Sequence, residues 1–129
     1  MIVDTSALVA LWRQEPGWEA INQKLVDDPK PLVSAATLVE LYIVLDSRTG
    51  PENRRRLNEW LDALGIVIEP FDRAQAEVAR AAYRDYGKGS GHPAHLNMGD
   101  CFSYALASVT HQPLLFVGDD FNHTDLVAA

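Results

Sequence analysis

The chain begins Met1-Ile2-Val3-Asp4-Thr5-Ser6, a very short apolar run that ends at an acidic residue. The same pattern recurs near the other end, where the apolar run 113–117 is followed by Gly118-Asp119-Asp120. Two further short apolar runs, 31–34 and 66–70, are typical of β-strands. Because stretches with helical spacing separate these runs, the sequence predicts an α/β fold with a parallel sheet.

The stretches between the strands predict helices over 7–13, 16–28, 35–47, 52–64, 73–86 and 98–110. Pro16 is expected in the first turn of the second helix, where a proline is tolerated. The third helix is apolar on nearly every side, which is typical of a buried helix. Asn97, with Asp100 three residues later, indicates a capping box for the last helix. The glycine-rich range 87–96 is expected to be a loop.

Length and composition are those of one globular domain spanning residues 1–129. Hydrophobic residues make up 47% and charged residues 22%, which excludes a disordered chain. The single cysteine, Cys101, excludes an intrachain disulfide and is expected to be a small buried residue. No signal peptide or membrane-spanning run is recognisable, so we expect a cytoplasmic protein without a membrane partner. The net charge of −7 argues against a protein that coats nucleic acid by charge alone.

Five carboxylates are expected to gather at one edge of the sheet. Asp4, Asp119 and Asp120 follow strands directly, and ligands of open parallel sheets bind at the carboxyl ends of the strands. Glu40 lies about 9 Å along its helix, at about 1.5 Å per residue. Asp100 begins another helix. Taken singly, each has a structural explanation: a helix cap, a turn or, for Glu40, an ion pair with an arginine.

Together, these carboxylates repel one another unless a cation neutralises them. Oxygen ligands without a usable pair of thiols favour Mg²⁺ or Mn²⁺ over zinc. All-carboxylate sites with divalent metal are typical of phosphodiester hydrolysis, in which one metal activates water and a second can steady the leaving oxygen. The sequence therefore predicts a metal-dependent hydrolase.

Four segments, taken in order, carry a family resemblance: 1–8, 38–41 (Leu-Val-Glu-Leu), 97–107 and 113–125. Together they resemble the PIN-domain family and, more closely, the VapC-type toxins of bacterial type II (VapBC) toxin–antitoxin pairs. The resemblance implies a three-layer α/β/α fold with a short, mostly parallel central sheet. It implies a Mg²⁺-dependent endoribonuclease that cuts RNA, often tRNA. It also implies a cognate VapB-type antitoxin and assembly as a homodimer.

The resemblance further implies roles for the acids. Asp4, Glu40 and Asp100 match the family's acidic core and, with Asp119, are the candidate catalytic residues. The candidate metal ligands are Asp4, Asp100 and Asp119, the last directly or through water. Glu40 binds a second metal or orients the attacking water. The products are expected to carry 5′-phosphate and 3′-hydroxyl ends.

Two further positions near the site follow from the same comparison of motifs. Many PIN domains carry their fourth acid where Gly118 stands, so the choice here falls on Asp119, with Asp120 as the alternative. Ser6 matches a hydroxyl position near the site and is a candidate supporting residue.

Cationic contacts to RNA are expected on the helix 73–86. Arg73, Arg80, Arg84 and Lys88 fall within a narrow arc if this helix continues, and the alternative is a solvated helix face. If the five acids are set aside as a metal site, 13 acidic residues remain against 11 basic ones. The acidity of the chain is therefore concentrated at the proposed site. The net charge of the rest of the chain is close to neutral and is compatible with an RNA substrate.

Two alternative functions remain. A phosphotransfer enzyme on a similar scaffold would use a second aspartate soon after Asp4 or a lysine after a late strand. Thr5 and Ser6 follow Asp4, and no lysine follows a strand, so the sequence argues against this class. A non-catalytic PIN-fold RNA-binding module would be indicated by loss of the acids, but all of them are present.

Overall fold

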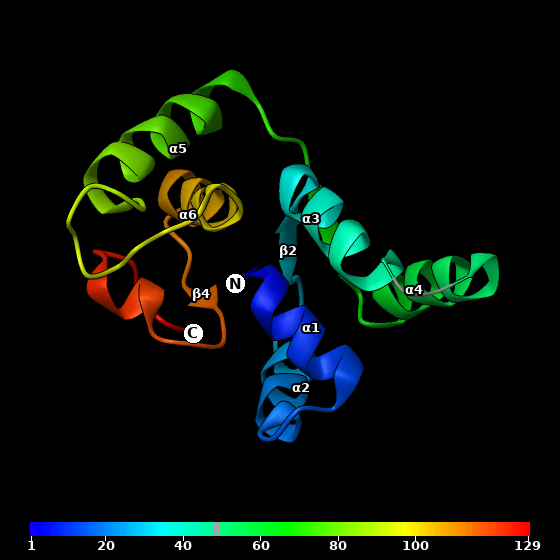
Figure 1. Cartoon of the computed structure of the whole chain (residues 1–129). Coiled ribbons are helices and arrows are strands. Elements are labelled where there is room, and N and C mark those ends of the chain that lie inside the picture. The colour runs from blue at the N-terminus through cyan, green and yellow to red at the C-terminus, as the bar shows by residue number, and fades with distance from the viewer. Residues whose placement is uncertain (48–49) are drawn as a thin grey trace.

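Four short parallel strands form one sheet at the centre of the computed structural model, which describes residues 1–47 and 50–129 (Figure 1). The strands are β1 (Ile2–Val3), β2 (Leu32–Ser34), β3 (Val67–Glu69) and β4 (Leu114–Leu115), in the order β3-β2-β1-β4. The chain runs outward from β1 to β3 and then returns past β1 to β4. The strand order therefore reverses between β1 and β4, and such a reversal marks the usual ligand site of open α/β sheets.

β1, β2 and β4 are buried on both faces, whereas the edge strand β3 is partly exposed, with Val67 at 36% and Ile68 at 38%. Successive side chains of a strand point to opposite faces of the sheet. One hydrophobic core contains Ile2, Leu32 and Leu114, and the other contains Val3, Val33 and Leu115. All six side chains are at most 5% exposed. Even two-residue strands thus contribute to both cores, which explains why they read as short uninterrupted apolar runs.

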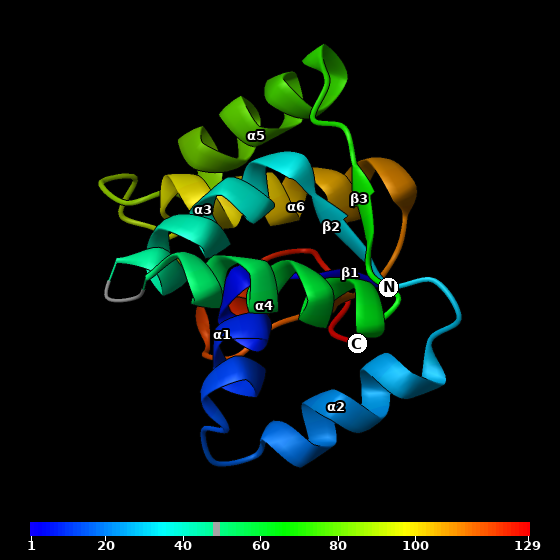
Figure 2. The same ribbon diagram turned by 90° about the vertical axis from the view of Figure 1, so that its right-hand side faces the viewer.

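Helices cover both faces of the sheet and give three layers (Figures 1 and 2). The Val3 face packs against α1 (Thr5–Arg13), α2 (Trp18–Asp27), α3 (Ala35–Asp46) and α4 (Pro51–Ala63). The Ile2 face packs against α5 (Arg73–Tyr86), α6 (Met98–Thr110) and the single-turn helix η1 (Asp120–His123). The expected α/β/α architecture is confirmed, and the sheet is parallel throughout the described chain.

The starts of the first two helices differ from the expectation. Helix α1 begins at Thr5, two residues early, because the Asp4 side chain accepts a hydrogen bond from the Ser6 amide and caps the helix. Helix α2 begins at Trp18 rather than Pro16, so the expected position of Pro16 in its first turn is wrong. Gly17, with φ of 92°, occupies the cap of α2, and Pro16 lies in the turn before it.

Helix α3 is not buried on all sides, so the sequence-based expectation for it is wrong. Its buried residues are Thr37, Leu41 and Leu45, whereas Val39 is 56% and Ile43 is 67% exposed. The helix lies at the rim of the three layers, where one of its sides has no neighbouring element (Figure 2). In the described ranges, no helix combines the length and apolar character needed to cross a membrane.

Candidate active site

A pocket of about 440 Å³ lies at the carboxyl edge of the sheet, where β1 turns into α1 and α6 begins. The structure brings Asp4, Glu40 and Asp100 together in its wall. Its lining residues are Asp4, Thr5, Ser6, Val9, Glu15, Glu40, Val44, Asn97, Asp100 and Val117. The charged groups in this lining are all acidic, which favours a cationic ligand.

Asp4 is the most buried of these acids, with 3% of its surface exposed. Its Oδ2 accepts hydrogen bonds from the Ser6 amide at 2.9 Å and the Ser6 hydroxyl at 2.7 Å. Its Oδ1 accepts a hydrogen bond from the Ser103 hydroxyl at 2.6 Å. The Ser6 hydroxyl in turn accepts a hydrogen bond from the Val117 amide at 3.0 Å. Asp4 therefore caps α1 and also faces the pocket, and Ser6 ties it to the segment after β4.

Asp100 occupies the first turn of α6, in the expected capping box with Asn97. Its Oδ2 accepts the Asn97 amide at 2.8 Å, and its own amide donates to Asn97 Oδ1 at 2.9 Å. Burial raises the pKa of Asp100 to about 7, against the effect of the Asn97 amide, and the charges of Asp4, Asp120 and Glu40 add to the rise. This carboxyl therefore lies close to three other acids, which is the arrangement that a bound cation would relieve.

Glu40 reaches the pocket from α3 because α6 presents a glycine to it. A Cβ atom at Gly99 would lie 1.5 Å from Glu40 Oε2, so no other residue leaves space for this carboxyl. Burial raises the pKa of Glu40, the Thr5 hydroxyl offsets part of that rise, and the charge of Asp4 adds to it. Glu40 is thus a more basic carboxylate than one in water.

The two acids after β4 have different surroundings. The Asp119 carboxylate is bonded to Asn122 Nδ2 at 3.0 Å and His123 Nε2 at 2.7 Å, and these bonds lower its pKa. Asp120 is the one whose charge raises the pKa of Asp100. Gly118 has φ of 109°, a conformation that disfavours any side chain, so this backbone does not suit an acid at that position. Neither Asp119 nor Asp120 is among the residues that line the pocket, and Asp119 is bonded within its own turn.

The pocket suits a hydrated divalent cation. Thr5 Oγ1 is buried in the pocket wall beside Glu40, whose pKa the Thr5 hydroxyl lowers. Among residues 1–47 and 50–129, no three His, Cys, Asp or Glu side chains are close enough to enclose an ion by themselves. Mg²⁺ is usually held by one or two carboxylates and keeps several waters. Asp4 and Asp100 are two carboxylates that line the pocket and are candidates for this role.

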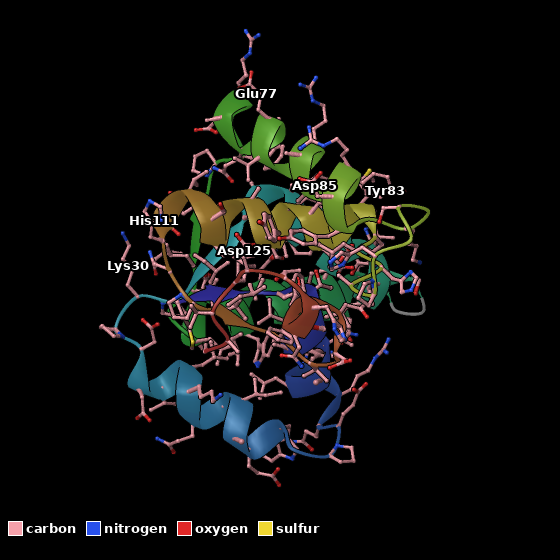
Figure 3. All side chains as sticks on the ribbon, turned by 90° about the vertical axis from the view of Figure 1, so that its left-hand side faces the viewer. Lys30, Glu77, Tyr83, Asp85, His111 and Asp125 are labelled. Carbon is pink, nitrogen blue, oxygen red and sulfur yellow. The ribbon has the colours of Figure 1, made fainter. Side chains whose placement is uncertain are left out.

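Three residues of the expected basic stripe lie on α5, namely Arg73, Arg80 and Arg84, and α5 packs on the far side of α6 from α1 (Figure 1). The expected continuation of the helix to Lys88 is wrong, because α5 ends at Tyr86 and the backbone is extended at Gly87. Arg73 pairs with Glu77 at 3.4 Å, and Arg84 pairs with Asp85 at 2.7 Å. Figure 3 shows Glu77 and Asp85 on the same helix. Arg80 and Lys88 are exposed and have no ion-pair partner within the described chain. The stripe is therefore mixed in charge. Lys88 and Arg84 belong to its end nearest the start of α6.

Four residues at or next to the site were not predicted from the sequence, namely Thr5, Thr37, Gly99 and Ser103. Thr37 precedes Glu40 by three residues, and Ser103 follows Asp100 by three. That spacing places each hydroxyl on the same helix face as the acid. Small polar residues one turn from a candidate acid were therefore a usable signal.

The raised pKa of Asp100 predicts that the metal-free protein becomes less stable to unfolding as the pH rises. The unfolded carboxyl titrates near 3.8 and the folded one near 7, so the folded state binds the extra proton between these values. The free energy of unfolding contributed by this group falls as pH rises through that window. Asp100→Asn is expected to stabilise the protein in EDTA by roughly 1–2 kcal/mol at pH 8, a value discounted for partial exposure, and by little near pH 4.

Urea unfolding of both proteins at pH 4.5 and pH 8 measures this difference. Asp62→Asn, an exposed carboxylate on α4, is the matched control. A stability difference between Asp100→Asn and the unaltered protein that is the same at both pH values would contradict the assigned electrostatics.

Gly99→Ala is expected to separate activity from stability. The new methyl group displaces the Glu40 carboxylate, while alanine favours the helix by up to about 1 kcal/mol. We expect the RNA cleavage inferred from the sequence to fall by about tenfold or more, which corresponds to roughly 1.4 kcal/mol. Thermal unfolding should remain within a few degrees of the unaltered protein. Gly50→Ala is the control, because a Cβ there meets no atom within 4 Å. Full activity in a folded Gly99→Ala protein would show that Glu40 has no role.

Comparisons with known proteins agree with this geometry. The family model of the PIN domain matches residues 1–126. A VapC ribonuclease of Mycobacterium bovis is 52% identical over 126 residues, which cover 98% of this chain and 96% of the relative. A ribonuclease VapC of Mycolicibacterium smegmatis is 48% identical over 128 residues, which cover 99% and 98%.

Solved structures share the fold. The crystal structure of Mycobacterium tuberculosis VapC20, described as a sarcin–ricin loop cleaving toxin, aligns with a TM-score of 0.77 at 17% identity and covers 99% of this chain and 97% of that one. A toxin–antitoxin complex from Klebsiella pneumoniae aligns with a TM-score of 0.74 at 20% identity and covers 99% and 95%. The resemblance expected from the sequence is confirmed, and the chain belongs to the PIN-domain family and, within it, to the VapC proteins.

Proposed function

We propose that this protein is a metal-dependent endoribonuclease and the toxin of a VapBC-type toxin–antitoxin pair. The observation that carries the proposal is the gathering of Asp4, Glu40 and Asp100 in one pocket, with the pKa of Asp100 raised to about 7. Relatives about half identical in sequence are named VapC ribonucleases, which supports RNA as the substrate class.

Mg²⁺ is the proposed cofactor, and Mn²⁺ is the alternative. Asp4 and Asp100 would hold the ion, because each presents a carboxylate to the pocket and neither is neutralised by a basic side chain. The bound ion would offset the repulsion among the acids and lower the pKa of water at the scissile phosphate. One metal suffices for this pair of ligands, and the substrate phosphate can complete its coordination.

The remaining residues orient the reaction. A Glu40 carboxylate oxygen would accept a proton from the attacking water, a role that its raised pKa favours. The water oxygen then bonds to phosphorus as the bond from phosphorus to the 3′-oxygen breaks. A solvent water would protonate that oxygen, and Glu40 would return its proton to solvent, which leaves 5′-phosphate and 3′-hydroxyl ends. Ser6 would keep the Asp4 carboxylate facing the pocket through its two hydrogen bonds.

Partners belong to the same proposal. RNA would meet Arg84 and Lys88, which are exposed near the start of α6, more readily than Arg73, which lies at the far end of α5. A VapB-type antitoxin and a second copy of the chain are the proposed protein partners, in line with the toxin–antitoxin complex among the structural neighbours. A cytoplasmic location is part of the proposal, because RNA and a newly translated antitoxin occur there.

Metal-dependent cleavage of RNA is the direct test. The purified protein should cleave total RNA or a tRNA pool in Mg²⁺ and stop in EDTA. Asp4→Asn and Asp100→Asn should lower the rate about 100-fold or more, since each removes an ion ligand worth several kcal/mol. Asp62→Asn, on α4, should cleave at the unaltered rate. Equal cleavage by all of these proteins with or without EDTA would refute the mechanism. Absence of cleavage together with intact RNA binding would favour the non-catalytic module.

The fourth acid is open to a separate test. We propose Asp120, because its charge acts on Asp100, whereas the Asp119 carboxylate is bonded to Asn122 and His123. Asp120→Asn should lower cleavage about tenfold, roughly 1.4 kcal/mol, and shift the acidic limb of the pH–rate profile downward. Asp119→Asn should retain most of the activity. The reverse order of effects would return the role to Asp119, the choice expected from the sequence.

A further inference from the structure

A chain of two buried hydroxyl groups reaches Asp4 from behind the pocket. The Ser103 hydroxyl of α6 donates to Asp4 Oδ1 at 2.6 Å, and the Thr37 hydroxyl of α3 lies 3.2 Å from the Ser103 oxygen. A hydroxyl has one proton, and Ser103 gives its proton to Asp4. Thr37 must therefore donate to Ser103, so the hydrogen bonds run from Thr37 through Ser103 to Asp4.

Neither hydroxyl is placed to touch a substrate. Ser103 is 0% and Thr37 is 1% exposed, and neither lines the pocket. Their only route to the chemistry is through the Asp4 carboxylate. Burying hydroxyls among apolar side chains is costly unless they are hydrogen-bonded, and alanine or valine would fill the same space without that cost.

The direction of these bonds sets them apart from ordinary helix hydroxyls. Serine and threonine inside a helix often donate to the carbonyl four residues earlier. Thr110 of α6 does so, with 2.6 Å between its hydroxyl and the Leu106 carbonyl oxygen. Ser103 on the same helix donates instead to a carboxylate in another part of the chain, and a hydroxyl-to-carboxylate bond of this length is among the stronger ones.

We propose that Thr37 and Ser103 form a positioning pair that fixes the Asp4 carboxylate and thereby sets the affinity of the pocket for a divalent cation. This inference rests on the proposed metal site. Oδ1 is held from α6 while Oδ2 is held by Ser6, so the carboxylate plane cannot rotate freely. A ligand held in place before the ion arrives loses less freedom on binding, and the partners of metal ligands are known to tune affinity.

The pair also lies one helical turn from each of the other two acids. Thr37 lies one turn before Glu40 on α3, and Ser103 lies one turn after Asp100 on α6. The Gly99–Glu40 approach and the Thr37–Ser103 bond are two contacts between these helices, one turn apart. Each helix carries an acid and a hydroxyl close to Asp4. Loss of the Thr37–Ser103 hydrogen bond is therefore expected to change the affinity of the pocket for a metal ion.

Calorimetric titration with Mn²⁺ tests the proposal on the whole chain. Ser103→Ala should raise the Mn²⁺ Kd about tenfold, and Thr37→Val about threefold, as expected for partners of a metal ligand. Thr37→Ser, which keeps the hydroxyl, should retain the affinity of the unaltered protein. The double variant should bind no more weakly than Ser103→Ala, because Thr37 acts through Ser103. Ser108→Ala, the same change elsewhere on α6, is the control and should leave Kd unchanged.

RNA cleavage in saturating Mn²⁺ gives a second readout. The turnover of the folded variants should approach that of the unaltered protein, while the Mn²⁺ concentration for half-maximal rate rises in parallel with Kd. Unchanged Kd in Ser103→Ala would overturn the positioning pair, as would additive effects in the double variant or equal losses in Thr37→Val and Thr37→Ser. Failure of the unaltered protein to bind Mn²⁺ would instead refute the metal site itself. The two Thr37 variants preserve the test if Ser103→Ala does not fold.

Discussion

The buried carboxylate of Asp4 is the group on which the other parts of the site depend. It ends β1, caps α1, and accepts hydrogen bonds from Ser6 and Ser103, so a strand and two helices meet at one side chain. The Ser6 hydroxyl extends the connection to the backbone after β4. These three donors satisfy both oxygens of the Asp4 carboxylate, which is almost fully buried. The carboxylate is thereby held at the carboxyl edge of the sheet, and the neighbouring acids must accommodate its charge.

That fixed charge has an electrostatic consequence for the other acids. Asp100 and Glu40 are raised in pKa by burial and by the charge of Asp4, and Asp100 reaches about 7. In the metal-free protein, burial and mutual repulsion therefore oppose the ionisation of all the carboxyl groups of the pocket near neutral pH. The strand order makes this arrangement possible, because the reversal between β1 and β4 opens the edge at which Asp4 emerges. The clustered acids thus lower the stability of the metal-free protein, and the same cluster favours the binding of a divalent ion.

Much of this arrangement was predictable from local patterns. Short apolar runs gave the strands, and acids at their ends indicated the site, because side-chain alternation and parallel topology are local rules. The partial exposure of α3 was not predictable. Val39 and Ile43 are exposed because no other element packs on their side of the helix, which only the tertiary structure determines. Gly99 and the Thr37–Ser103 bond also escaped prediction, because their roles arise only when α3 and α6 pack together. The bonds from Asn122 and His123 to Asp119 were also not predicted, because they arise from the turn after β4, and the choice between Asp119 and Asp120 stays a prediction.

The central claim is that the acids around Asp4 bind one divalent cation at the carboxyl edge of the sheet. Anomalous X-ray scattering from crystals soaked in Mn²⁺ tests it most directly. The account predicts a peak between the carboxylates of Asp4 and Asp100, at roughly 2.0–2.2 Å from one oxygen of each, as for small oxygen-liganded cations. The peak should disappear in crystals of Asp100→Asn. Mn²⁺ bound at other positions, with no peak between Asp4 and Asp100 at saturating concentration, would contradict it.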